Sequence, residues 1–167
     1  MHNELTRQDI ELMQKELDYR RLELKPRLIE AVKEARAFGD LSENFEYKAA
    51  KKEKNQNDSR IRYLENMIST AVVISGKAAA DAVGLYDHVT VYLEDDEEEM
   101  TLQIVTTMRQ DALKGLISKE SPVGRALLGR HVGDRVHIQA SESYGYDAVV
   151  RRIEKGSDDG SAPLVAY

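Results

Sequence analysis

Apolar side chains in the first part of the chain recur close to every seventh residue, which predicts a long amphipathic helix from Thr6 to Phe38. The repeat comprises Ile10, Met13, Leu17, Leu24, Leu28, Ala31 and Ala35. Thr6 and Asp9 have the spacing of a capping box at its start, and Gly39 is expected to end it. Pro26 would cost about 3 kcal/mol inside a regular helix, so we expect a kink or a compensating neighbour there.

A second helical pattern extends from about Glu43 to Ile74. Its inward-facing apolar positions are Tyr47, Ala50, Ile61, Leu64, Ile68 and Ala71. Lys54 and Asn57 fall on the same face, so the middle of the helix pair should be polar. Because only a few residues separate the two patterns, they should fold back as an antiparallel coiled-coil hairpin. Neither helix has enough apolar surface to be buried on all sides, which predicts an exposed arm about 45 Å long.

The pattern changes after Gly76 and predicts strands in place of long helices. The strands are expected at residues 85–93, 100–106, 136–139 and 146–154, the first two joined by the acidic turn EDDEEE. A helix is expected between the second and third of these strands, with Ser121 as its cap, Pro122 at its first position and Gly129 at its end. This order predicts a small α+β domain. The tail from Gly156, rich in Gly, Ser and Asp, should be loose until its last residues.

Composition and charge narrow the class of protein. The net charge of −6 argues against free, non-specific binding to nucleic acid. Residues 1–75 hold 14 basic and 14 acidic side chains, which leaves 10 basic and 16 acidic ones, from totals of 24 and 30, for residues 76–167. This asymmetry suggests two domains, 1–75 and 76–167, with different tasks. The absence of Cys excludes disulfides and thiolate metal sites, and the chain shows neither a membrane-length apolar run nor a signal peptide. We therefore expect a soluble cytoplasmic protein without a membrane partner.

Few residues offer chemistry of their own. The sequence contains no Gly-rich phosphate loop and no Ser-His-Asp constellation. The four His residues, at positions 2, 88, 131 and 137, are scattered. His88 and His137 lie on predicted strands and are better explained as structural residues than as ligands. We expect no metal site in the isolated protein.

The predicted turn of the hairpin carries the most informative side chains. Asp40, Glu43 and Glu46 are spaced three apart, so they share a face wherever the backbone is helical. Two carboxylates at the end of an arm could hold one face of a Mg²⁺ ion. On spacing alone, Asp40 and Glu43 are more simply explained as a capping box for the second helix. The two roles are compatible, because a capping carboxylate keeps spare lone pairs.

A run of lysines follows the turn. Lys48, Lys51, Lys52 and Lys54 could follow a phosphate backbone. More often such a run is a solvated helix face, and composition alone favours that interpretation.

Four segments carry a resemblance to a known family. GDLSENFEYKAA (39–50) closely resembles the tip of the Gre transcript-cleavage factors of bacterial RNA polymerase, most like the GreA type. LTRQDIELMQKEL (5–17) and KPRLIEAVKEAR (25–36), including Pro26, look like the first helix of that family. ISKESPVGRALLGRHVGD (117–134) looks like the signature of its C-terminal domain. The matches occur in the family's order and span most of the chain.

The resemblance implies a fold and a task. The fold is an N-terminal antiparallel coiled coil followed by an α+β domain related to FK506-binding proteins. Gre factors bind bacterial RNA polymerase at its secondary channel and insert the coiled coil toward the active site. There they stimulate cleavage of the RNA 3′ end in backtracked complexes. The implied factor is not an enzyme itself, has no cofactor of its own, and assists Mg²⁺ in the polymerase active site.

The resemblance also assigns roles to residues. By position, Asp40 and Glu43 match the tip acids thought to help hold the second Mg²⁺. Ser121 and Pro122 lie in the motif of the domain that anchors the factor on the polymerase rim. The lysines at 48, 51 and 52 would then form a basic face near the nascent RNA 3′ end.

One departure from the family keeps other functions open. Phe45 stands where a small residue is expected, and it could pack on the other helix or stack near the RNA end. A factor of the same architecture that enters the channel and inhibits without stimulating cleavage is the first alternative. A prolyl isomerase is disfavoured because the chain has no Trp and both Phe residues, 38 and 45, lie in the hairpin. A plain coiled-coil adaptor would need neither tip acid.

Overall fold

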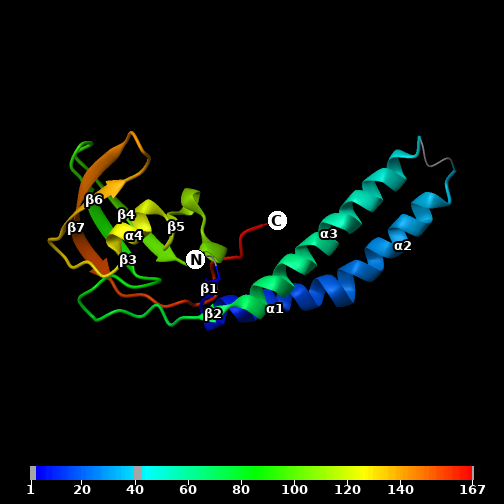
Figure 1. Cartoon of the computed structure of the whole chain (residues 1–167), viewed down its shortest axis with the longest axis horizontal. Helices are drawn as coiled ribbons and strands as arrows, with labels where there is room; N and C mark the ends of the chain where they lie inside the picture. Colours follow the sequence, from blue (N-terminus) through cyan, green and yellow to red (C-terminus); the bar gives the residue numbers. More distant parts are fainter. Residues whose placement is uncertain (1–2, 40–42, 167) are drawn as a thin grey trace. The chain divides into compact units, whose positions relative to one another are not determined.

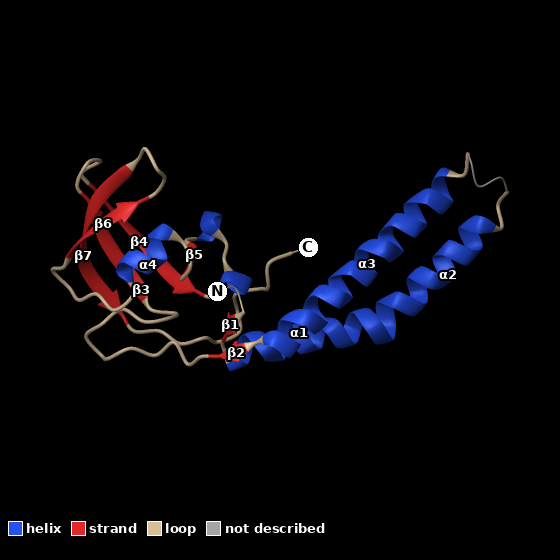
Figure 2. Ribbon diagram, in the orientation of Figure 1, coloured by secondary structure: helices blue, strands red, loops and turns tan. Residues whose placement is uncertain are grey.

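Helices dominate the first half of the chain and strands the second, which confirms the predicted α+β class (Figure 2). The structure is a computed structural model that describes residues 3–39 and 43–166. Two compact units emerge from the contacts between residues. The helical unit contains Ile10–Ala71, and the strand-rich unit contains Val72–Ala166 together with the chain up to Asp9.

The predicted first helix is interrupted. It consists of α1 (Arg7–Tyr19), the π-helical turn η1 (Arg20–Leu24) and α2 (Lys25–Arg36). Pro26 lies in the first turn of α2, directly after the π-helical turn. A π turn is wider than an α turn and gives room to a residue that lacks an N–H and whose ring crowds the preceding turn. The π-helical turn before Pro26 therefore compensates for the proline, as the sequence led us to expect.

The capping box at the start of α1 is confirmed. The Thr6 N–H donates to Asp9 Oδ2 over 2.9 Å, and the Asp9 N–H donates to Thr6 Oγ1 over 3.2 Å. These two bonds satisfy donors that a helix start leaves without partners.

Helix α3 (Phe45–Thr70) runs antiparallel to α2, so the predicted hairpin is confirmed (Figure 1). The buried apolar side chains described in the helical unit are Met13, Leu17, Leu28, Ala35, Ile61, Leu64 and Met67. α2 ends at Arg36, just short of the predicted stop at Gly39, whose φ is +129°.

The middle of the hairpin is polar, as Asn57 predicts. Arg20 Nη1 donates to Asn57 Oδ1 over 2.9 Å, and Asn57 Nδ2 donates to the Arg20 carbonyl over 3.3 Å. Arg60, which the apolar pattern did not single out, is only 3% exposed and donates through Nε to Glu16 Oε2 over 2.6 Å. Glu16 also accepts from Arg20 Nε over 2.9 Å. The buried Arg60 of α3 is therefore paired with the partly buried Glu16 of α1.

We predict that Glu16→Gln destabilises the hairpin at neutral pH but not in acid. Burial alone would raise the pKa of Glu16, but the hydrogen bonds from Arg60 and Arg20 outweigh it and hold the pKa below its usual value of 4.5. A depressed pKa in the folded state adds stability above the unfolded pKa, and this contribution is lost as pH falls through the folded pKa. At pH 7 the variant should lose about 1–3 kcal/mol of unfolding free energy. Urea titrations at neutral and acidic pH measure this difference, and an equal deficit at both would contradict the argument.

The predicted C-terminal end of the second helix is wrong. α3 ends at Thr70, and Val72–Val73 form the short strand β2, which pairs in parallel with β1 (Glu4–Leu5). The Val72 N–H donates to the Asn3 carbonyl over 2.8 Å, and the Ile74 N–H donates to the Leu5 carbonyl over 2.9 Å. Val is β-branched and fits extended backbone well, so a pairing partner from the start of the chain replaces the helix.

Five strands form the larger sheet of the strand-rich unit, in the order β5-β4-β3-β7-β6. They are β3 (His88–Leu93), β4 (Glu98–Val105), β5 (Leu116–Ser118), β6 (Arg135–Gln139) and β7 (Gly145–Glu154). All neighbours are antiparallel except β4 and β5. Four of the strands match predicted ones, and the three-residue β5 was not predicted. Alternate residues such as Val89 and Val91 on β3 and Val136 and Ile138 on β6 are buried in one core.

The short helix α4 (Pro122–Leu127) lies between β5 and β6 in the sequence, as predicted. Gly124 on this helix is buried, and a Cβ there would lie 2.1 Å from the Ser118 carbonyl oxygen. A glycine is therefore needed for the close approach of α4 to the end of β5.

The tail after β7 is not loose, contrary to the prediction. Arg109, fully buried, donates from Nη1 and Nη2 to the two Asp158 carboxylate oxygens, each over 2.9 Å. It also donates to the Ala162 carbonyl over 2.5 Å and to Asp9 Oδ1 over 3.1 Å. The Val165 N–H donates to the Met108 carbonyl over 2.8 Å. The tail is therefore held by an arginine far away in the sequence.

Within residues 3–39 and 43–166, no helix has the length and apolar character needed to cross a membrane. The same residues contain no group of three or more His, Asp or Glu side chains placed to hold a metal ion. His88 and His137 lie on β3 and β6, as predicted, and His137 Nδ1 lies 2.9 Å from Asp147 Oδ1.

Candidate functional site

Asn44 organises the end of the hairpin that carries the predicted acids. Its Oδ1 accepts from the Tyr47 N–H over 3.0 Å, which makes it the N-cap of α3. Its Nδ2 donates to the Ala35 carbonyl over 2.6 Å near the end of α2. A single side chain therefore starts one helix and ties it to the end of the other.

Of the two acids predicted at the tip, the structure describes only Glu43. Asp40 lies outside the described residues. Glu43 is exposed and directly precedes the N-cap, and its carboxylate makes no hydrogen bond with a described residue. The capping-box interpretation of Asp40 and Glu43 is wrong for α3, because Asn44 performs that role. The Glu43 carboxylate is thus exposed and is not required to start the helix.

Tyr47 forms a second link between the helices. Arg36 Nη2 donates to the Tyr47 hydroxyl over 3.2 Å, and its guanidinium lies 5.3 Å from the centre of the Tyr47 ring. This hydrogen bond lowers the pKa of Tyr47, because it stabilises the phenolate form. Lys51 Nζ lies 6.0 Å from the centre of the same ring. These contacts link α2 to α3 next to the cap at Asn44 and place positive charge around the Tyr47 ring.

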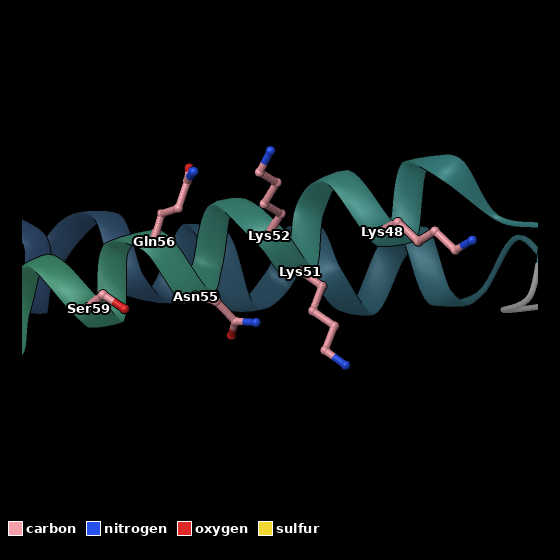
Figure 3. Close-up of a pocket in the computed structure, with 6 residues that line it drawn as sticks. All are labelled: Lys48, Lys51, Lys52, Asn55, Gln56 and Ser59. Atoms are coloured by element: carbon pink, nitrogen blue, oxygen red, sulfur yellow. The ribbon is translucent and has the colours of Figure 1, made fainter. Parts of the chain in front are cut away.

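The lysines predicted to form a basic face border a shallow surface depression on α3. Lys48, Lys51, Lys52, Asn55, Gln56 and Ser59 line a volume of about 430 Å³. Figure 3 shows the ends of the Lys51 and Lys52 side chains pointing to opposite edges of the face that they share, while Lys48 points along the helix. In the part of the chain that the structure describes, Lys51 and Lys52 have no carboxylate partner. The diverging ammonium groups suit an extended polyanion better than one small anion.

Both Phe residues lie at this end of the hairpin, and both are 77% exposed. Phe38 follows α2, and Phe45 is the first residue of α3. The structure excludes the suggestion that Phe45 packs into the opposite helix. The sequence pattern singled out Phe45 as a departure from the family but gave Phe38 no role at the tip.

Ser121 and Pro122, the two residues predicted to contact a partner from the C-terminal domain, differ in how accessible their side chains are. Ser121 caps α4: its Oγ accepts from the Gly124 N–H over 3.0 Å and donates to the Ser118 carbonyl over 2.7 Å. Pro122 is exposed at the first position of α4. The Ser121 hydroxyl is therefore engaged within the fold, whereas the Pro122 ring is open to a partner.

The described residues supply parts of a reaction site, but not a complete one. Glu43 can act as a ligand of a hard cation, and the lysines can hold a phosphate backbone. Exposed carboxylates alone bind Mg²⁺ weakly, since this ion keeps several waters and needs further oxygen ligands.

Comparison with protein families gives two matches. Residues 3–73 match the model described as the N-terminal part of transcription elongation factors. Residues 78–155 match the model described as the C-terminal part of the transcription elongation factors GreA and GreB.

Individual proteins similar to this chain are also named as transcription elongation factors. The transcription elongation factor GreA of Chelativorans sp. (strain BNC1) is 45% identical over 148 residues, covering 87% of this chain and 93% of that protein. The GreA of Sinorhizobium medicae (strain WSM419) is 46% identical over 129 residues, covering 77% of this chain and 82% of that protein. Among solved structures, Gfh1 of Thermus aquaticus is 27% identical, with a TM-score of 0.41 over 91% of this chain and 97% of that chain.

Proposed function

The chain belongs to the GreA/GreB family of transcription elongation factors, and on this premise we propose that it stimulates RNA cleavage by bacterial RNA polymerase. The factor inserts its helical hairpin through the secondary channel of a backtracked or arrested complex. The polymerase then cuts the displaced 3′ segment of the transcript and resumes synthesis from the new end. Cytoplasmic polymerase and the nascent RNA 3′ end are thus its partners.

The observation that supports this proposal most directly is the exposed Glu43 carboxylate, which the fold does not use to cap α3. Asp40, three residues earlier, is proposed as its companion on the basis of the GDLSEN sequence. Together they would help to hold the second Mg²⁺ of the polymerase active site and orient the attacking water. In two-metal phosphodiester cleavage the ions stabilise the attacking and leaving oxygens.

Electrostatics explains why the acids would act only inside the polymerase. Two unit charges 4 Å apart interact by about 1 kcal/mol in water, but by about 4 kcal/mol at an effective dielectric constant of 20. Glu43 is exposed to water in the isolated chain, where its pull on a cation is weak. In a narrow channel beside carboxylates that already hold a metal, the same charge has a larger effect. The chain is therefore proposed to assist a catalyst and not to cut RNA alone.

Other surfaces would position the hairpin. Lys48, Lys51 and Lys52 lie behind the tip on α3 and are proposed to contact the phosphates of the extruded RNA. The C-terminal domain is proposed to bind the polymerase rim through the surface around Pro122, with Ser121 holding α4 in shape.

The test of this function is a transcript-cleavage assay. The purified full-length chain is added with Mg²⁺ to a stalled elongation complex whose RNA carries a 5′ label, and the RNA is sized. Shortened transcripts that can be extended again are expected. Blocked synthesis without shortening would instead support the alternative of an inhibitory channel factor, which Phe45 at the tip keeps open. The chain alone should leave free RNA intact.

We predict that Pro122→Ala weakens binding to the polymerase without changing the cleavage step. Removal of the exposed ring takes away a contact surface, while Ala still permits the start of α4. The concentration of factor that gives half-maximal cleavage should rise, with an unchanged rate at saturation. Leu113→Ala, at a residue of the same unit that is 99% exposed, is the matched control and should leave both quantities unchanged. An unaltered half-maximal concentration for Pro122→Ala would remove Pro122 from the interface.

A further inference from the structure

The chain places its only two phenylalanines, Phe38 and Phe45, on the surface. Each ring forgoes the stabilisation that burial of a large apolar side chain provides. The two residues come from different helices, yet they line one cavity of about 680 Å³ together with Glu43, Asn44 and Glu46. Two exposed aromatic rings beside one cavity indicate a site for a flat partner.

The charged groups around the cavity define the chemistry of its occupant. Lys48 Nζ lies 5.6 Å from the centre of the Phe45 ring, so a cation stands beside the aromatic face. Glu43 and Glu46 provide carboxylate oxygens, which accept hydrogen bonds. A nucleotide offers a matching set: a flat base, an anionic phosphate and, on most bases, an N–H₂ donor.

We propose that Phe38 and Phe45 form a stacking site for an unpaired base of the extruded RNA 3′ segment. This inference rests on the proposed function and adds the part of the RNA that the tip recognises. The base stacks on the rings, its phosphate lies toward Lys48, and its amino edge faces Glu46, which leaves Glu43 for the metal ion. The lysines at 51 and 52 continue the path for the backbone along α3.

The carboxylates argue against an apolar protein surface as the occupant. Such a surface would cover Glu43 and Glu46 without offering them donors, and an unpaired buried carboxylate is costly. A base covers the rings while its polar edge satisfies Glu46. Stacking tolerates any sequence, since every base has a π-face, which suits a factor that must act wherever the polymerase stops.

The experiment uses the full-length chain and a backtracked elongation complex whose extruded RNA ends in the fluorescent base 2-aminopurine. Ca²⁺ replaces Mg²⁺ to keep the transcript intact. Stacking on an aromatic ring quenches this base, so addition of the chain should lower its fluorescence. Phe45→Tyr should preserve the quenching, because the ring remains. Phe45→Leu, which keeps apolar volume but removes the ring, should abolish most of it, and Phe38→Leu should weaken it.

A second measurement follows cleavage in Mg²⁺. Phe45→Leu should raise the factor concentration for half-maximal cleavage by about 5-fold or more, the effect of losing one stacked base. Leu22→Ala, at a hairpin residue that is 74% exposed, is the matched control and should change neither quenching nor cleavage. Because the substituted side chains are exposed, thermal unfolding of all variants should match the original chain.

The outcomes separate this inference from the function on which it rests. If the original chain shortens transcripts but Phe38→Leu and Phe45→Leu quench as well as it does, only the stacking site is refuted. Equal quenching by Phe45→Leu and Phe45→Tyr would likewise overturn it. If the original chain binds the complex but shortens no transcript, the proposed function fails and the stacking site falls with it.

Discussion

Replacing Glu43 with Gln is expected to lower the rate of stimulated RNA cleavage by about 10²-fold or more while polymerase binding persists. The amide keeps the size of the side chain and removes its charge, so a ligand for a metal ion is lost. Loss of one electrostatic group that acts in the transition state commonly costs 10²–10³-fold in rate. Since Asn44 and not Glu43 caps α3, the hairpin should fold as before. The same loss is expected for Asp40→Ala and Glu43→Ala.

The measurement is the single-turnover cleavage rate of a backtracked complex at saturating factor. Binding is measured separately, by competition with the labelled original chain for the polymerase. Glu34→Gln, which removes an exposed charge from α2 further from the tip, is the control for net charge. Full cleavage rates in both Asp40→Ala and Glu43→Gln would refute the assignment of the tip acids.

The second large effect is expected in the strand-rich unit, where Arg109→Met should cost about 3–5 kcal/mol of unfolding free energy. The Arg109 side chain is fully buried and pairs with Asp9, which is also fully buried, and with Asp158, which is 11% exposed. Met fills much of the space of the arginine but leaves two carboxylates without their cation. An uncompensated buried charge is far more destabilising than the loss of an exposed ion pair.

Amide hydrogen exchange of Val89 and Val91, buried on β3, reports this change within the full chain. Their exchange through global opening of the unit should speed up by about 10²-fold or more, the factor that corresponds to about 3 kcal/mol. Adding Asp9→Asn and Asp158→Asn to Arg109→Met should restore part of the loss, because the buried negative charges disappear. Exchange rates within fivefold of the original chain in Arg109→Met would show that the cluster contributes little to stability.

Features that depend on neighbours in the sequence were predictable. The Thr6–Asp9 box and the Ser121 cap of α4 form between residues three apart, so residue type and spacing suffice. The pattern of residues 85–93 predicted a strand, and β3 occupies its second part, His88–Leu93. The relation of this domain to FK506-binding proteins stays a prediction.

Features that depend on distant partners were missed. Val72–Val73 continues a helical pattern in the sequence, but it becomes a strand because Glu4–Leu5 offers backbone groups to pair with. Gly156 opens a polar tail that has the composition of a loose segment, but Arg109 holds that tail through Asp158 and the Ala162 carbonyl. No local pattern encodes such contacts, since a buried charge is tolerated only where the whole fold supplies its partners.

The candidate site divides in the same way. The sequence by itself determined which chemical groups lie at the turn of the hairpin, because the acids, lysines and phenylalanines are contiguous along the chain. Only the tertiary structure decided how they are used. It gave the capping role to Asn44, which bonds across to Ala35, and so freed Glu43. It also brought Phe38 and Phe45 to one cavity. They lie at the ends of two different helices, and only the packing of α3 against α2 places them side by side.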